Sequence, residues 1–177
     1  MQKPTIDIEA LREHSYDVIG AIYEVHKELG PGLSEYVYQE GLAMQLQEQS
    51  IEFNKEQAFR PTYHGSPMTA EYRMDFLCKG DIIVECKSVL KLVSEHRAQL
   101  FNYMRLMKLP VGILVNFAAK SAQVERYFYD ENQHEIYGSD GYPVNQFTAH
   151  ASKDWSRKIY HVESILKNQI YKINKIS

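Results

Sequence analysis

The chain has 177 residues, of which 44% are hydrophobic and 24% charged, and its formal net charge is −3. These values are typical of an ordinary globular protein of one domain, with room for an appendage, so disorder is not the default expectation. No stretch approaches the ~20 apolar residues of a membrane span. Residues 1–15 also lack the apolar segment of a secretion signal. We therefore expect a cytoplasmic protein with no membrane partner.

The charge is unevenly distributed along the chain. Residues 1–56 carry four basic and eleven acidic side chains, whereas residues 150–177 carry six basic and two acidic ones. A protein that binds nucleic acid over a broad face usually has a larger basic excess. The overall charge therefore argues against tight, extended DNA binding.

Two helices are predicted at the start of the chain. Apolar residues recur at three- and four-residue spacings over 7–29, which predicts an amphipathic helix. Gly30 and Pro31 are suited to ending it, because glycine is a good C-cap and proline cannot continue a helix. Ser34 is a plausible N-cap for a second helix over 35–50.

The remaining elements alternate between strand and helix patterns. In chain order they are strand-like runs at 51–63, 69–78 and 82–87, a helix at 94–108, strands at 110–117 and 123–129, and a final amphipathic helix at 154–175. The first three runs are joined by turn sequences, which predicts an antiparallel meander. The run 110–117 is apolar throughout, so it should lie in the middle of the sheet with both faces covered. The order predicts a mixed sheet with helices packed on it.

Charged residues end the apolar strand at 82–87. Glu85 and Lys87 are separated by one residue, so they share a face of the strand, roughly 6–7 Å apart. Asp75 lies on the preceding strand, and a hairpin can bring it beside Glu85. Two adjacent carboxylates repel unless a cation lies between them, and Mg²⁺ accepts one or two carboxylates. This pattern predicts phosphodiester hydrolysis, although a cross-strand ion pair between Asp75 and Lys87 is the structural alternative.

Five sequence blocks together resemble a known family. They are EVHKELGPG, GLSEYVY with the form G-x-x-E-x-x-Y, YRMDFLCKGDIIVECKSV, EHRAQLFNYM and GILVNFA. In this order they resemble the small bacterial GxxExxY family of the PD-(D/E)XK nuclease superfamily. The resemblance covers roughly residues 15–129. Met74 stands where the superfamily pattern has its proline.

The resemblance implies a fold and an activity. The fold is α/β, a restriction-endonuclease-like αβββαβ core with a mixed β-sheet flanked by helices, over residues 1–130. Residues 131–177 extend beyond the resemblance, and their residue pattern predicts a C-terminal extension whose amphipathic helix packs on the core or forms a homodimer contact. The implied activity is Mg²⁺- or Mn²⁺-dependent hydrolysis of nucleic acid, with DNA expected because the superfamily leans that way.

The resemblance also implies roles for individual residues. The implied metal ligands are Asp75, Glu85 and the backbone carbonyl of Cys86, and the implied catalytic residues are Lys87, Glu35 and Gln99. Tyr103, one helical turn after Gln99, would line the same cleft and bind substrate. Position alone adds two substrate-binding candidates: His96, three residues before Gln99, and Tyr38, three residues after Glu35.

Structural readings of some of these residues stay open. Glu35 follows the presumed N-cap, where a carboxylate favours the helix dipole. Tyr103 also fits the apolar stripe of its helix, and Tyr38 could simply pack. His96 could cap its helix or lie at the surface. The rival hypothesis is a non-catalytic module that binds nucleic acid or protein and retains the nuclease-like fold.

Overall fold

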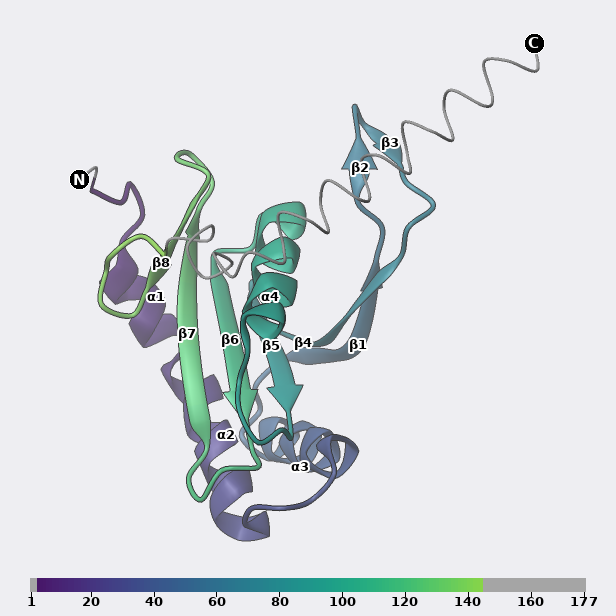
Figure 1. Ribbon diagram of the computed structural model, residues 1–177, viewed down its shortest axis with the longest axis vertical. Coiled ribbons are helices and arrows are strands. Elements are labelled where there is room, and N and C mark those ends of the chain that lie inside the picture. Colours follow the sequence, from purple (N-terminus) through teal and green to yellow (C-terminus); the bar gives the residue numbers. More distant parts are fainter. Residues whose placement is uncertain (1–2, 145–177) are drawn as a thin grey trace. The chain divides into compact units, whose positions relative to one another are not determined.

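The computed structural model describes residues 3–144 (Figure 1). The expected helix at 154–175, with the homodimer contact assigned to it, lies outside the described residues. Among the described helices, none is long and apolar enough to cross a membrane.

A six-stranded mixed sheet forms the centre of the described part. Its spatial order is β1 (Phe53–Phe59), β4 (Tyr72–Cys78), β5 (Ile82–Lys87), β6 (Val111–Asn116), β7 (Gln123–Asp130) and β8 (Glu135–Gly138). Neighbouring strands are antiparallel except β5 and β6, which are parallel and joined through helix α4 (Ser94–Met107). Every residue of β6 is buried, which confirms the predicted central strand. The pairing of β8 with β7, which was not predicted, extends the sheet past residue 130.

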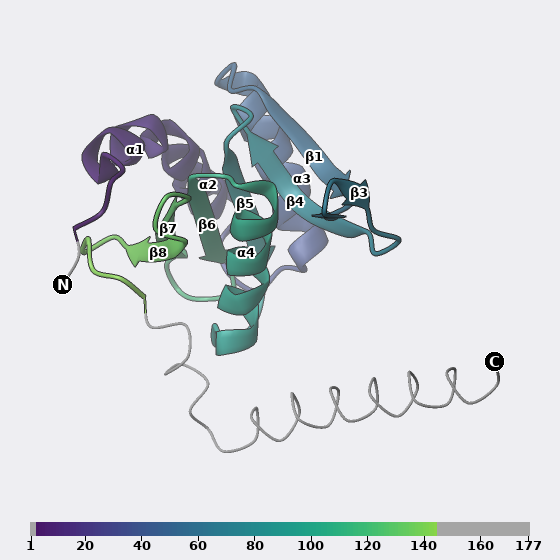
Figure 2. The same cartoon turned by 90° about the horizontal axis from the view of Figure 1, so that it is seen from above.

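Helices cover both faces of the sheet, as Figure 2 shows. Helices α2 (Tyr16–Leu29) and α3 (Glu35–Glu48) pack on one face, and α4 packs on the other. Gly112 in β6 permits this second layer, because a Cβ there would clash with Met104 and Leu100 of α4. The order α3, β1, β4, β5, α4, β6 is the predicted αβββαβ core, so the α/β fold class is confirmed.

A small hairpin interrupts the core between β1 and β4. It consists of β2 (Thr62–Tyr63) and β3 (Ser66–Pro67), and it projects from the main sheet in Figure 1. His64 and Gly65 at its tip both have positive φ, 49° and 80°. This geometry suits a two-residue hairpin turn. The run 51–63, predicted as one strand, is therefore β1 followed by β2.

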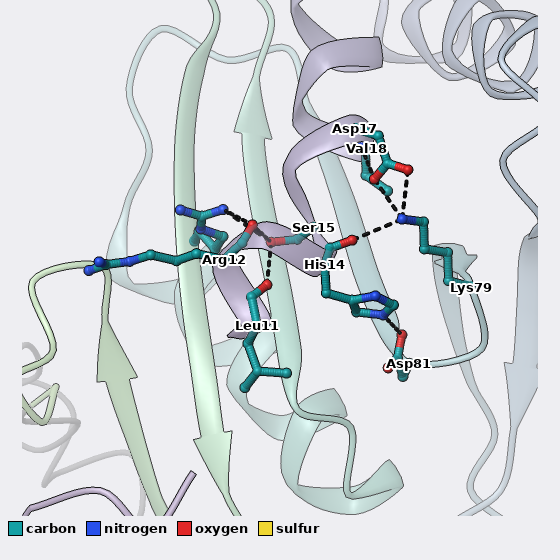
Figure 3. Close-up of polar contacts among 9 residues, drawn as sticks. Leu11, Arg12, His14, Ser15, Asp17, Val18, Lys79 and Asp81 are labelled. Carbon is teal, nitrogen blue, oxygen red and sulfur yellow. Dashed lines mark hydrogen bonds and ion pairs between the residues drawn. The ribbon is translucent and has the colours of Figure 1, made fainter. Parts of the chain in front are cut away.

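The single N-terminal helix predicted at 7–29 is wrong, because it is broken at Ser15 into α1 (Ile8–His14) and α2. The buried Ser15 hydroxyl donates to the Leu11 carbonyl at 2.8 Å (Figure 3). The Arg126 guanidinium, which comes from β7, donates to the Arg12 carbonyl at 3.0 Å and to Ser15 Oγ at 3.1 Å. These side chains thus hydrogen-bond backbone carbonyl groups next to the break.

The same break is attached to the turn between β4 and β5. Lys79 Nζ donates to the His14 carbonyl at 2.9 Å and pairs with Asp17 at 2.6 Å (Figure 3). His14 Nε2 lies 2.8 Å from an Asp81 carboxylate oxygen. These contacts help to fix the first two helices against the strands that carry the candidate site.

Candidate active site

Asp75 and Glu85 converge where β4 and β5 separate. Regular pairing ends at Phe76 opposite Val84, and the same register places Asp75 opposite Glu85. The Asp75 amide donates to Glu85 Oε1 at 3.3 Å, and the Cys86 amide donates to Asp75 Oδ2 at 2.8 Å. Side-chain carboxylates therefore bond the backbone across the gap between the two strands. The expected proximity of the two carboxylates is confirmed.

The neighbouring strand β1 is distorted at the same level. Its pairing with β4 runs through Lys55 and Gln57 but omits Glu56, the position across from Asp75. Glu56 has φ of 52°. This left-handed backbone is uncommon for a residue other than glycine, and such strain is often found at functional sites.

Glu85 is the most enclosed charged group of the cluster. It is 1% exposed, and its Oε2 accepts a hydrogen bond from Gln99 Nε2 at 3.1 Å and lies 3.8 Å from Lys87 Nζ. Burial, followed by the charge of Asp75, raises the pKa of Glu85 to about 8. Burial also raises the pKa of Asp75, against the opposing effects of the Cys86 amide and Lys87. Both carboxyl groups would be stabilised by additional positive charge.

The donor set fits a hard divalent cation that retains most of its water. Mg²⁺ is commonly held by one or two carboxylates, and oxygen is its preferred ligand atom. No group of three or more His, Cys, Asp and Glu side chains within the described range is arranged to hold a metal ion. Asp75 and Glu85 supply a pair, so they suit Mg²⁺ or Mn²⁺ better than a closed all-protein site.

Cys86 has its thiol on the opposite face from Glu85. It lies in the fully buried cluster between the sheet and helices α2 and α3. Burial raises the pKa of this thiol well above its ordinary value. The thiol is thus a core group, and any contribution of Cys86 to a metal site would come from its backbone.

Helix α3 contributes one predicted and one unpredicted residue. Glu35 is the first residue of the helix, and its charge adds to the effects that raise the pKa of Glu85. Gln39 follows one turn later, is buried, and hydrogen-bonds the Asp75 carboxyl group through its side chain. Residues four apart share a helix face, so this spacing was the available signal for Gln39.

Helix α4 carries Gln99 and Tyr103 on one face, as their i, i+4 spacing predicted, and it places Gln99 against Glu85. Besides bonding Glu85, Gln99 Nε2 donates to the Tyr103 hydroxyl at 3.0 Å. The Tyr103 ring is buried and packs edge-on against Phe59 and near Tyr72, with centroid distances of 5.5 and 5.9 Å. Tyr103 therefore combines core packing with a polar contact that supports Gln99.

Tyr38 is not brought to the carboxylate pair. It is fully buried, and its ring stacks on Phe117 with a centroid distance of 4.6 Å. Its hydroxyl donates to the Gly30 carbonyl at 2.6 Å and accepts from the Leu33 amide at 3.1 Å. These bonds fix the loop that precedes Glu35.

His96 lies near Lys87 but also caps its own helix. Its Nδ1 accepts a hydrogen bond from the Val93 amide at 3.2 Å. Burial, followed by the Lys87 charge, lowers the pKa of His96. His96 therefore caps its helix, which was the structural alternative to substrate binding. Its ring is also within electrostatic range of Lys87.

Asn116, which the sequence did not predict as part of the site, holds the chain next to Lys87. It is buried beside Lys87 in the β5–β6 register. Its Oδ1 accepts from the Val89 amide at 3.1 Å, and its Nδ2 donates to the Val89 carbonyl at 2.8 Å. A polar residue ending the otherwise apolar run of β6 was the only signal for it. Asn116 fixes the chain just after Lys87.

Comparison with known proteins identifies a matching protein family and one similar solved structure. The sequence model of the PD-(D/E)XK nuclease superfamily matches residues 12–127. No curated protein matches significantly. The solved structure described as "Crystal structure of SSO0001" is similar with a TM-score of 0.43 and 20% identity, over 71% of this chain and 64% of that one. The chain thus spans less than two thirds of that protein.

The matched residues contain the whole αβββαβ core. They also contain the candidate site residues Asp75, Glu85, Lys87 and Gln99. It covers well over half of the 177 residues. The chain therefore belongs to the PD-(D/E)XK nuclease superfamily.

Proposed function

We propose that this protein is a Mg²⁺- or Mn²⁺-dependent nuclease of the GxxExxY type that hydrolyses phosphodiester bonds, with DNA as its substrate. The observation that carries the proposal is the opposed pair Asp75 and Glu85, whose pKa values are both raised, with Lys87 Nζ 3.8 Å from Glu85. A metal ion held there would supply positive charge for the phosphate and activate water.

The protein groups have distinct tasks in this proposal. Asp75, Glu85 and the Cys86 carbonyl hold the cation. Lys87 stabilises the negative charge that develops on the phosphate, since a fixed ammonium in a partly buried site acts strongly on nearby charge. Gln99 keeps Glu85 in place through its 3.1 Å hydrogen bond.

Three further groups act around this pair. Glu35 positions water or a second ion at the edge of the site. His96, within electrostatic range of Lys87, would meet a phosphate bound beside that lysine. Tyr103 supports Gln99, whereas Tyr38 shapes the loop before Glu35.

Removal of the lysine provides the test. Purified protein with Mg²⁺ or Mn²⁺ should nick or degrade labelled single- or double-stranded DNA. Lys87→Ala should lower the rate by about 100-fold or more, as is typical for loss of one group that stabilises developing charge. Lys108→Ala is the matched control, because Lys108 is exposed and pairs with Glu131. Activity that survives in Lys87→Ala would indicate a contaminating nuclease.

The metal can be tested separately from turnover. Calorimetric titration with Mn²⁺ should show binding that Glu85→Gln weakens at least about tenfold. DNA binding without cleavage and without a metal response would instead favour the non-catalytic binding module.

A further inference from the structure

The loop between β5 and α4 holds one leucine outward. Leu90 has a relative exposure of 105%. Its neighbours Val89 and Leu92 pack inward, into the hydrophobic cluster that α4 shares with the sheet. Leu90 is therefore exposed although the residues on either side of it in the loop pack against the core.

Hydrogen bonds brace this loop at several positions. Ser88 Oγ donates to the Leu33 carbonyl at 2.7 Å. The Asn116 side chain bonds both the amide and the carbonyl of Val89. At the far end, the Val93 amide donates to His96. Hydrogen bonds thus hold the chain on both sides of the tip, while the Leu90 side chain is exposed to water.

The loop also starts at the candidate site. Leu90 is three residues after Lys87, and the exposed Lys91 follows it directly. Along the chain, Leu90 thus stands between Lys87 and Lys91. An apolar side chain flanked in sequence by cations matches the chemistry of nucleic acid, which combines apolar base faces with a phosphate backbone.

We propose that Leu90 packs against a nucleobase next to the phosphate that is cut, and that it thereby selects substrates with unpaired or weakly stacked bases. This inference rests on the proposed nuclease function. Insertion of an apolar side chain between paired bases requires unstacking, and this cost is lowest where a base is mismatched or single-stranded. Leu90 would therefore favour single strands, bulges and mismatches over intact duplex.

The test compares cleavage of two DNA duplexes of the same sequence, one fully paired and one with a single-base bulge, in Mn²⁺. The wild-type protein should cut the bulged duplex faster. Leu90→Ala should reduce this preference by about tenfold, the scale of losing one base contact, whereas Leu90→Met should retain it. Leu106→Ala is the control, since Leu106 is 44% exposed on α4.

A second readout avoids turnover. In Ca²⁺, 2-aminopurine placed in the bulge should change its fluorescence on binding the wild-type protein but not on binding Leu90→Ala, and both proteins should unfold at the same temperature. Equal preference and equal fluorescence in the two proteins would overturn the role of Leu90 and leave the nuclease proposal standing. A wild-type protein that neither binds nor cuts either DNA would overturn both.

Discussion

Glu85 shows most clearly how single residues shape this site. Its carboxyl group is almost fully buried, faces Asp75, and has Lys87 only at 3.8 Å. At this separation the lysine does not offset burial and the second carboxyl group, because the pKa of Glu85 is still raised to about 8. The ion-pair alternative placed Lys87 with Asp75, whereas the structure pairs Lys87 with Glu85. This pairing leaves the pKa of Glu85 raised, so the lysine alone does not neutralise the two carboxyl groups.

Glu85→Gln should stabilise the metal-free protein at high pH. The pKa of Glu85 in the folded protein, about 8, lies above the ordinary value of 4.5. The protonated Glu85 carboxyl group therefore contributes to the free energy of unfolding, and this contribution is complete below pH 4.5 and is lost as the pH rises through 8. Glutamine stays neutral and avoids this loss, on the order of a few kcal/mol at pH 9. Urea unfolding in EDTA at pH 5 and pH 9 measures the difference.

Exposed Glu48 provides the control, since Glu48→Gln should unfold like the wild type at both pH values. If Glu85→Gln had the same free energy of unfolding as the wild type at pH 9, Glu85 would be adequately paired without metal.

At the scale of elements, the end of β5 depends on supports from other parts of the fold. Helix α4 supplies Gln99, helix α3 supplies Gln39, and β6 supplies Asn116. The sequence predicted the helices and strands that carry them, and the i, i+4 spacing predicted that Gln99 and Tyr103 share a face. It did not predict the contacts of Gln39 or Asn116, because the spacing of Gln39 from Glu35 shows only a shared helix face, and the bonding partners Asp75 and Val89 are distant in sequence.

Asn116→Ala should destabilise the loop after β5. It would leave the amide and carbonyl of Val89 without their side-chain partner, at a cost of about 2 kcal/mol. The melting temperature should fall by about 5 °C. Differential scanning calorimetry would measure this change.

Gln123→Ala is the matched comparison, because Gln123 is exposed and accepts only a 3.2 Å bond from Asn116. Its effect should be within about 0.5 kcal/mol, as for most surface changes. A similar loss of stability in both variants would mean that the hydrogen bonds to Val89 contribute little to the free energy of unfolding.

At the scale of the whole described molecule, stability should be graded from the middle of the sheet outward. β6 lies between β5 and β7, is buried along its length, and is covered by helices on both faces. The β2–β3 hairpin is exposed and pairs only with itself. Local opening costs least where few buried contacts are lost.

Hydrogen exchange followed by mass spectrometry should reveal this gradient. Amides of β6 should exchange at least about 1000-fold more slowly than those of the hairpin, since they open only with global unfolding. Comparable rates in the two segments would contradict the two-sided core as the main source of stability.

Three features were predictable from residues that are close in the chain: the order of the αβββαβ core, the central place of the apolar strand at 110–117, and the shared face of Glu85 and Lys87. These features depend on local periodicity and on chain neighbours, which a single sequence displays. The break at Ser15, the added strand β8, and the contacts of Gln39 and Asn116 became apparent only in the folded chain. Each of these depends on hydrogen bonds between segments far apart in the chain, and the local pattern of residues does not encode such partners.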